Sequence, residues 1–292
     1  MFPCKTLEKP LVFANEMHYP VPIVSSQVRS QDTRVADVID ELQSAGRYTV
    51  STKELEVLCG KSNTAVESAV RRLKSKKRLF SPRQGFLVIV PLEYRTVGAP
   101  PPSWFIADLM AYVQRDYYVG LLSAAAMYGA AHHKPQVFQV VTTGAMRDIR
   151  RGRIWIQFVV SSSMDSVPIR EVQVPTGYIR LSTPEATALD LVRFYKQSGG
   201  MSHVATILAD LGEEISSEQF HKIFGYARMP ELQRLGYILD LVGWDSLTTP
   251  LFEQVSAKKP RTIYLTPGRH KDSSSPSHRW RLQITQPLEV DS

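Results

Sequence analysis

Cysteine is scarce in this chain: Cys4 and Cys59 are the only two among 292 residues. Two cysteines cannot build a disulfide framework, and without a Cys-x-x-Cys pair they do not form a zinc-binding motif. This sparing use of cysteine is typical of reducing compartments. Because Cys59 ends the apolar edge of a predicted helix, we expect it to be a small buried side chain.

Long apolar runs are missing as well. No stretch approaches the roughly 18 consecutive apolar residues that a membrane-spanning helix needs. The apolar residues 11–14 are bounded by Pro10 and Asn15, which leaves them too short for the core of a signal peptide. We therefore expect a cytoplasmic protein with no membrane partner.

Motifs of the common catalytic and nucleotide-binding sites are also absent. The metal ions of a nucleotidyltransferase are held by two closely spaced carboxylates, and no Asp-x-Asp pair occurs in this chain. The chain has no Walker A loop, no His-Glu-x-x-His and no Gly-x-Ser-x-Gly. The seven histidines are scattered. The sequence therefore predicts a protein that is not an enzyme and that has no cofactor and no metal site.

Basic residues are present in excess, and they are clustered. Residues 61–83 contain eight basic residues and one acidic residue, a net charge of +7 that equals the net charge of the whole chain. Such clustering is the electrostatic footprint of phosphate binding and is not typical of an ordinary solvated surface. Double-stranded DNA is therefore the first predicted partner. Residues 258–281, with a net charge of +6, are a second candidate surface for nucleic acid.

Residues 51–75 have the pattern of a helix–turn–helix. Ser51 and Glu54 form a predicted capping box at the start of the first helix, and Gly60 is expected to end it. Ser62 is the predicted N-cap of the second helix. That helix has one apolar stripe and an opposite face of small polar and arginine side chains, which suits a DNA major groove.

A β-hairpin is predicted directly after these helices. Residues 78–80 and 85–90 have the composition of strands, and residues 81–84 between them have turn chemistry that places Arg83 at the tip. An amphipathic helix over residues 33–45 and a short strand over residues 48–50 precede the helix pair. Together they predict a winged helix-turn-helix domain over residues 31–96.

Two groups of side chains are expected to contact the DNA. Asn and Arg can form bidentate bonds with base edges, and the predicted groove-facing residues are Ser62, Asn63, Thr64, Ser68, Arg71 and Arg72. The predicted phosphate contacts are Lys61, Lys74, Lys76, Lys77 and Arg83.

The rest of the chain predicts an α+β protein in which the winged helix precedes a larger mixed α/β domain. Residues 1–30 are expected to be an irregular arm, residues 97–103 a Pro-rich linker, and residues 104–292 the second domain. Within it we expect helices over 104–114, 117–129, 186–195, 202–211, 217–227 and 230–242, strands over 137–142 and 154–160 around an arginine-containing loop, and a hairpin over 171–181.

The segments of the second domain, in their order, resemble the AbiEi antitoxin family. They read YYVGLLSAAAMYGAAHH, GRIWIQFVV, STPEATALDLV, the Gly199-Gly200 break and ELQRLGYILDLVG, and the resemblance covers residues 33–290. It implies a transcriptional regulator paired with a nucleotidyltransferase toxin in a type IV toxin–antitoxin system linked to phage defence. The winged helix would bind inverted repeats upstream of the operon and repress it, and the C-terminal domain would neutralise the toxin. Because the family is described as acting without a stable complex, direct toxin binding stays open.

The antitoxin surface is assigned to basic residues of the second domain, with the plain alternative of an exposed loop that has no function. The candidates are Arg147, Arg150, Arg151 and Arg153, together with His132 and His133. Glu185 and Asp190 are expected to be capping and surface helix residues and not a catalytic pair. The alternative function is a winged-helix regulator without a toxin, whose C-terminal domain senses a ligand or partner. A neighbouring nucleotidyltransferase gene would decide between the two functions.

Overall fold

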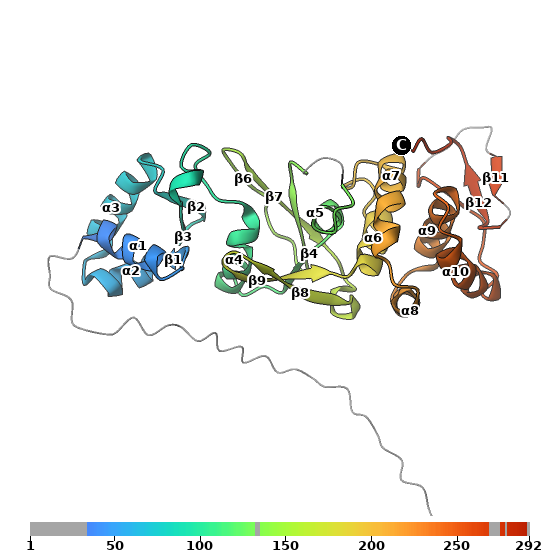
Figure 1. Cartoon of the computed structure of the whole chain (residues 1–292), viewed down its shortest axis with the longest axis horizontal. Coiled ribbons are helices and arrows are strands. Elements are labelled where there is room, and N and C mark those ends of the chain that lie inside the picture. The colour runs from blue at the N-terminus through green and yellow to red at the C-terminus, as the bar shows by residue number, and fades with distance from the viewer. Residues whose placement is uncertain (1–33, 132–134, 269–274, 278, 291–292) are drawn as a thin grey trace, which may run out of the picture.

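The computed structural model describes residues 34–131, 135–268, 275–277 and 279–290. Its elements follow the chain along the long axis of the molecule: an N-terminal unit, a central sheet and a helical C-terminal unit (Figure 1). The fold is mixed α+β, as predicted. The expected N-terminal arm (residues 1–30), Cys4, His132 and His133 lie outside the described residues. Within the described part, none of the helices combines the length and apolarity needed to cross a bilayer.

The N-terminal unit contains the helices and strands that its sequence pattern predicts. They are α1 (Val35–Ser44), β1 (Thr49–Ser51), α2 (Thr52–Cys59), α3 (Asn63–Ser75), β2 (Leu79–Arg83) and β3 (Phe86–Ile89). The strands form an antiparallel sheet in the order β1-β3-β2. The apolar stripes of the three helices meet in one core, in which Cys59 is buried as expected.

The hairpin of this unit turns later than predicted. β2 continues through Ser81 and Pro82 to Arg83, and the turn consists of Gln84 and Gly85. Gly85 has a φ of +77°, a conformation that favours glycine. Pro82 is tolerated within the strand because β2 lies at the edge of the sheet.

The predicted helix caps need two corrections. The Ser51 hydroxyl accepts a hydrogen bond from the Glu54 amide at 3.1 Å, as expected. The Glu54 carboxylate, however, binds the guanidinium of Arg47 at 2.6 Å instead of reaching back to Ser51. Ser62 stands at the N-cap of α3, but its side chain forms no capping bond. Its hydroxyl lies 3.2 Å from that of Thr64.

The central sheet has six strands in the order β6-β7-β5-β4-β9-β8. They are β4 (Tyr117–Val119), β5 (Phe138–Thr142), β6 (Ile149–Arg151), β7 (Ile154–Val160), β8 (Ile169–Val174) and β9 (Gly177–Ser182). Two of them correct the sequence prediction. Residues 117–119 form a central strand and not the start of a helix, and residues 149–151 form an edge strand and not a loop.

Both faces of this sheet are covered, because alternate side chains enter two different cores. Tyr117, Val119 and Val140 face the side of α4 (Ile106–Tyr112) and the N-terminal unit. Tyr118 and Val141 face the core that α6 (Pro184–Arg193) and the other C-terminal helices build. A strand buried on both faces reads as a continuous apolar run, which explains why residues 117–119 resembled part of the buried helix that follows them, α5 (Leu121–Met127).

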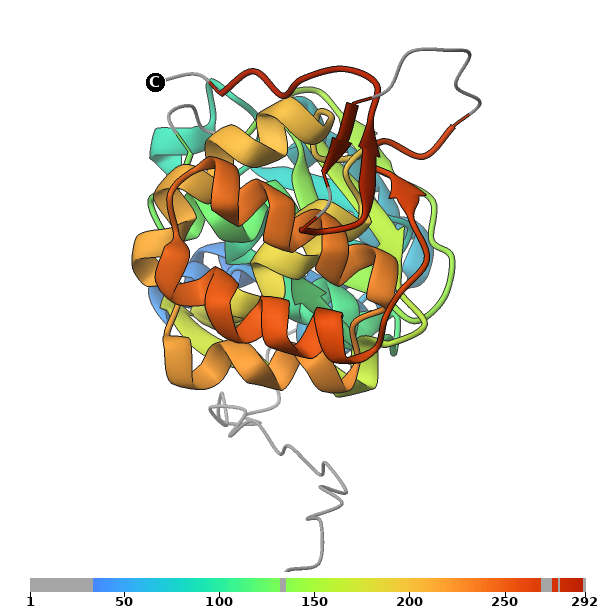
Figure 2. The same ribbon diagram turned by 90° about the vertical axis from the view of Figure 1, so that its right-hand side faces the viewer.

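The C-terminal unit consists of helices closed by a small sheet (Figure 2). Its elements are α6 (Pro184–Arg193), α7 (Met201–Leu211), α8 (Ser217–Phe220), α9 (Met229–Leu241), α10 (Asp245–Ala257), β10 (Ile263–Tyr264), β11 (Ser275–Ser277) and β12 (Leu282–Ile284). The sequence did not predict α10, which contains Pro250. Trp280 is fully buried against Gly236 of α9, and its indole N–H donates to Asp240 at 2.5 Å.

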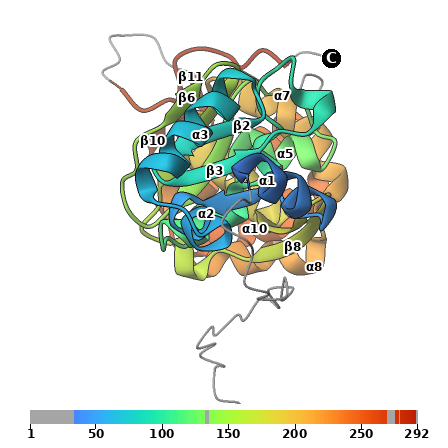
Figure 3. The same cartoon turned by 90° about the vertical axis from the view of Figure 1, so that its left-hand side faces the viewer.

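The N-terminal unit, which faces the viewer in Figure 3, packs directly on the central unit. Strand β3 is buried on both faces: Leu87 enters the N-terminal core and Phe86 enters the core shared with α4. The rings of Phe80 and Phe105 lie 6.0 Å apart, and those of Phe86 and Tyr112 lie 5.3 Å apart. The two units are therefore joined by apolar packing as well as by the chain.

Candidate nucleic-acid interface

The outer face of α3 carries most of the residues predicted to contact DNA. The 13 residues of α3 span about 20 Å at 1.5 Å per residue, and Val66, Val70 and Leu73 bury its inner face. Of the eleven predicted DNA-contacting residues, all are exposed except Lys61 and Arg83, which are half-buried. This helix thus presents a polar, basic surface of the length that a major groove accommodates.

Five cations of this surface are free to bind a ligand. Among the residues that the structure describes, no side-chain hydrogen bond or ion pair engages Lys61, Arg71, Arg72, Lys74 or Lys76.

Other members of the cluster are engaged within the protein. The Asn63 amide donates to Glu56 at 2.7 Å, and the Lys77 ammonium donates to the carbonyl of Thr96 at 3.2 Å. Arg78, which contributes to the basic run in the sequence, forms an ion pair with Asp40.

Arg83 does not stand at a free wing tip. It lies at the end of β2, and its Nη2 donates to the carbonyl of Arg147 at 3.4 Å. The Tyr112 hydroxyl on α4 donates to the carbonyl of Gln84 in the adjacent turn at 3.3 Å. The tip of the β2–β3 hairpin is therefore seated against the central unit.

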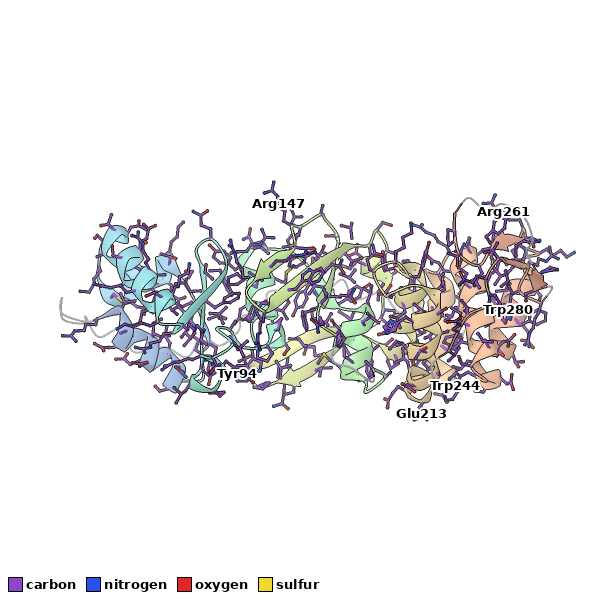
Figure 4. The ribbon with its side chains drawn as sticks, turned by 90° about the horizontal axis from the view of Figure 1, so that it is seen from above. Tyr94, Arg147, Glu213, Trp244, Arg261 and Trp280 are labelled. Atoms are coloured by element: carbon purple, nitrogen blue, oxygen red, sulfur yellow. The ribbon has the colours of Figure 1, made fainter. Side chains whose placement is uncertain are left out.

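The four arginines predicted as an antitoxin surface lie beside this tip. Arg150 and Arg151 belong to the edge strand β6, and Arg147 and Arg153 flank it; all four are exposed. The Arg150 guanidinium lies 3.8 Å from the centre of the Trp155 ring. Figure 4 shows the Arg147 side chain extending away from the body of the molecule.

Two clefts connect these arginines with the basic end of α3. The larger one, of about 580 Å³, is lined by cations from both units, Lys74, Lys77, Arg83 and Arg151. A shallower one of about 360 Å³ is lined by Arg83, Arg147, Arg150 and Arg151, with Asp148 as its single acidic residue. The structure thus brings together two groups of residues that the sequence prediction had kept apart. We call the surface made by Lys74, Lys77, Arg83, Arg147, Arg150 and Arg151 the junction surface.

The central sheet and the helices that follow it match a known family. Residues 118–241, from β4 to the end of α9, match the family model of the AbiEi antitoxin C-terminal domain. This segment, which we call the AbiEi domain, is thus similar to the C-terminal domain of AbiEi antitoxins. The predicted resemblance to the AbiEi family is thereby confirmed.

One solved structure extends the comparison to nearly the whole chain. The RV2827C protein from Mycobacterium tuberculosis is 16% identical to this chain, with a TM-score of 0.63 over 89% of this chain and 92% of that chain. At this identity the likeness shows a shared fold alone. No curated protein matches the chain.

The AbiEi domain also contains a buried network of charged groups that the sequence prediction had placed at the surface. Asp190 is 0% exposed and Glu185 is 4% exposed, so neither is a surface residue. The Glu185 carboxylate accepts the amide of Ser216 at 2.9 Å. Asp190 accepts the Tyr118 hydroxyl at 2.7 Å and lies 3.5 Å from Nη1 of Arg193.

Arg193 connects this network to α9. Its Nε and Nη2 donate to the two carboxylate oxygens of Glu231 at 2.9 and 3.0 Å, and its Nη1 donates to the Ser163 hydroxyl at 2.9 Å. Burial raises the pKa of Asp190 to about 6, although the hydrogen bond from Tyr118 and the charge of Arg193 lower it. Because the donors of Arg193 are occupied by protein groups, the network holds α6 to α9 and the β7 end and leaves little for a ligand.

Metal chemistry has no obvious place in the described part of the chain. No three side chains of the types His, Cys, Asp or Glu converge there to hold a metal ion.

The sequence contained signals for only part of what the structure shows. Residues 149–151 are too few to show a strand period, but the Gly152-Arg153 turn in front of the strand at 154–160 was a signal that a hairpin partner precedes it. The spacing of Asp190 and Arg193 by three residues on one helix could have indicated their contact. No local sequence pattern indicates that Arg193 pairs with Glu231, which lies 38 residues further along the chain.

Proposed function

We propose that this chain is the antitoxin of a toxin–antitoxin pair and represses its own operon. The AbiEi antitoxin domain at residues 118–241 supports the antitoxin role. The proposed toxin is a nucleotidyltransferase encoded beside it. The antitoxin would counteract this toxin in the cell, with or without forming a stable complex with it. The proposed DNA ligand is the operator of the chain's own operon, arranged as inverted repeats.

The N-terminal unit is the proposed DNA-binding part. Its order of elements, with three helices and an antiparallel sheet that ends in a hairpin, is the order of a winged helix-turn-helix. In that arrangement the second helix of the pair, here α3, enters the major groove. The observation that carries the proposal is the outer face of α3 together with its two ends, where five cations have no partner among the described residues.

Within α3, position separates the proposed base contacts from the proposed phosphate contacts. Thr64, Ser68 and Arg71 follow one another at spacings of four and three residues, so they share one face of the helix. An arginine on that face can bind guanine through two hydrogen bonds, which contributes about 1–3 kcal/mol of discrimination. Lys74 and Lys76 lie at the C-terminal end of α3, where a lysine is better suited to the phosphate backbone.

DNA binding is tested by mobility shift on the region upstream of the gene. Arg71→Ala is expected to weaken operator binding by roughly 5- to 150-fold and to relax specificity at one base pair. Lys74→Ala is expected to weaken all duplexes alike and to reduce the slope of log K against log salt by about 1. Lys222→Ala, an exposed lysine of the C-terminal unit, is the control. Wild-type affinity of a folded Arg71→Ala/Lys74→Ala protein would contradict the proposal.

The antitoxin role is tested separately by growth rescue. The full chain is co-expressed with the neighbouring candidate toxin gene, alone and as Arg71→Ala/Lys74→Ala. Because these residues lie outside the AbiEi domain, the variant is expected to rescue growth as well as the wild type. Failure of the wild-type chain to rescue growth would remove the antitoxin role and leave only the regulator.

A further inference from the structure

The hairpin of the N-terminal unit cannot act as a free wing. Phe80 and Phe86 on its strands pack against Phe105 and Tyr112 of the central unit. The turn is held at the carbonyl of Gln84, and Arg83 is held at the carbonyl of Arg147. A wing that follows the DNA backbone needs an exposed basic tip, and here the neighbouring unit occupies that position.

The β6–β7 hairpin of the central unit projects at this same place. Figure 1 and Figure 3 both show the β6–β7 hairpin next to β2 and on the same side of the molecule as α3. Its turn contains Gly152, with a φ of +58°, followed by Arg153. Strand β6 lies at the edge of the six-stranded sheet, so its outer side is free of a further strand.

The charge of this hairpin is not neutralised within the described part of the protein. No ion pair engages Arg147, Arg150 or Arg151 there. The one acidic residue nearby, Asp148, accepts the backbone amide of Phe158 at 3.2 Å. The ring of Trp155 packs against the Arg150 guanidinium and restrains it, which reduces the entropy lost when the guanidinium binds an anion.

The junction surface joins the hairpin to α3 without a break. Lys74 and Lys77 line the same 580 Å³ cleft as Arg151, and Arg83 lines both this cleft and the one bounded by Arg147. Several like charges side by side repel one another and favour binding of a polyanion. Two clefts on one side of α3 match an elongated ligand with regularly spaced charges better than a single small anion.

We propose that the β6–β7 hairpin replaces the wing: the junction surface binds the phosphate backbone of the duplex that flanks the base pairs read by α3. This inference rests on the proposed DNA-binding function and makes the AbiEi domain a direct contributor to DNA affinity. It assigns Arg147, Arg150 and Arg151 to DNA in place of a toxin.

The test compares two triple variants with the same change in net charge. Arg147→Gln/Arg150→Gln/Arg151→Gln removes the hairpin charges and keeps long polar side chains. Lys196→Gln/Lys222→Gln/Arg228→Gln removes three exposed cations from the C-terminal unit, all outside residues 258–281. Affinity for an operator duplex and for an unrelated duplex of equal length is measured between about 50 and 200 mM salt. Over this range the affinity falls steeply with salt when a protein makes several phosphate contacts.

The hairpin variant is expected to lose phosphate contacts only. Each contact contributes about 0.9 to the slope of log K against log salt. Loss of three contacts should therefore reduce the slope by about 2–3 and weaken binding to both duplexes by about 100-fold or more near 0.1 M salt. In ethylation interference, the hairpin variant should no longer be sensitive to ethylation of the phosphates outside the α3 footprint. The C-terminal control variant should bind as the wild type.

The outcomes separate this inference from the proposed function. If Arg71→Ala weakens binding while the hairpin variant keeps the wild-type salt slope, the hairpin does not contact DNA and the inference is overturned. If the hairpin variant binds DNA normally but no longer rescues growth from the toxin, these arginines belong to an antitoxin surface and the inference is again overturned. If the wild type binds neither duplex, the proposed DNA-binding function itself fails. Thermal unfolding of both triple variants checks that each is folded.

Discussion

Arg193 is the side chain whose loss should most weaken the AbiEi domain. In Arg193→Met, the apolar stem is kept and the guanidinium is removed. Glu231, which is 6% exposed, then loses both donors of its bidentate bond, and Asp190, which is 0% exposed, loses the one cation that contacts it among the described residues. Two buried carboxyl groups thus lose the guanidinium that lies between them.

The expected loss follows from the cost of an uncompensated buried charge. Removing one partner of a buried ion pair typically lowers the free energy of unfolding by about 3–5 kcal/mol. The Arg193–Glu231 pair is bidentate at 2.9 and 3.0 Å, and fork geometry of this kind is among the stronger arrangements. We therefore expect a loss near the upper end of that range at pH 8.

The loss should also depend on pH. Arg193 lowers the pKa of Asp190, which burial has raised to about 6. Removing the guanidinium raises the folded-state pKa further, so the folded variant holds its proton to a higher pH than the folded wild type. Above pH 6 the destabilisation should grow with pH, by at most about 1.4 kcal/mol per pH unit, until the variant's carboxyl group ionises.

Urea unfolding at pH 5.5 and pH 8 measures both effects. Arg71→Met, which removes an exposed arginine without a partner among the described residues, is the matched control and should change stability by less than about 0.5 kcal/mol. Arg193→Met/Glu231→Met should lose clearly less than the sum of the single variants, because an apolar pair leaves one charged carboxyl group fewer. Additive losses, or an Arg193→Met protein as stable as the control, would refute the role given to this network.

Three further predictions concern single positions. Burial raises the pKa of Asp190 from its ordinary value of 3.8 to about 6, so the folded state binds more protons than the unfolded state between these pH values. Relative to Asp190→Asn, the wild type should therefore lose about 2.4 kcal/mol of unfolding free energy between pH 4 and pH 7; a difference that stays constant with pH would contradict this. In Gly236→Ala, the added Cβ would lie 2.2 Å from the Trp280 ring, so thermal unfolding should show a loss of about 1–3 kcal/mol, while Gly225→Ala, where nothing lies within 4 Å, should show no such clash. Gly60→Ala introduces a side chain at φ +60° at the end of α2, again with nothing within 4 Å, and should cost about 1 kcal/mol in urea unfolding through backbone strain alone.

The sequence by itself determined the elements whose information is local. The stripes of α1 and α3, the glycine at the end of α2 and the hairpin of β8 and β9 follow from a period of 3.6 or 2 and from turn residues. The resemblance of the second-domain segments to the AbiEi family could also be recognised from the sequence, and the family model matches residues 118–241. The contacts of the eleven residues with DNA and the domain boundaries stay predictions.

Secondary structure was harder to predict for elements that are buried on both faces, that are very short, or that other elements stabilise. Residues 117–119 do not show the alternation of apolar and polar residues that is typical of a strand, because both faces of β4 are buried. Residues 149–151 were assigned to a loop because three residues are too few to show a period. Pro250 stands inside α10, where a proline would normally end a helix.

Only the tertiary structure decided which charges meet. Arg193 and Glu231 are 38 residues apart, and Arg83 and Arg147 are 64 residues apart. A local pattern states which side of a helix or strand is buried, but it does not state which other element covers that side. The order of the strands places β6 at the edge next to the β2–β3 turn, and the packing of α6 on α9 places Arg193 opposite Glu231. The charged groups of this protein were therefore visible in its sequence, and their partners were fixed by the fold.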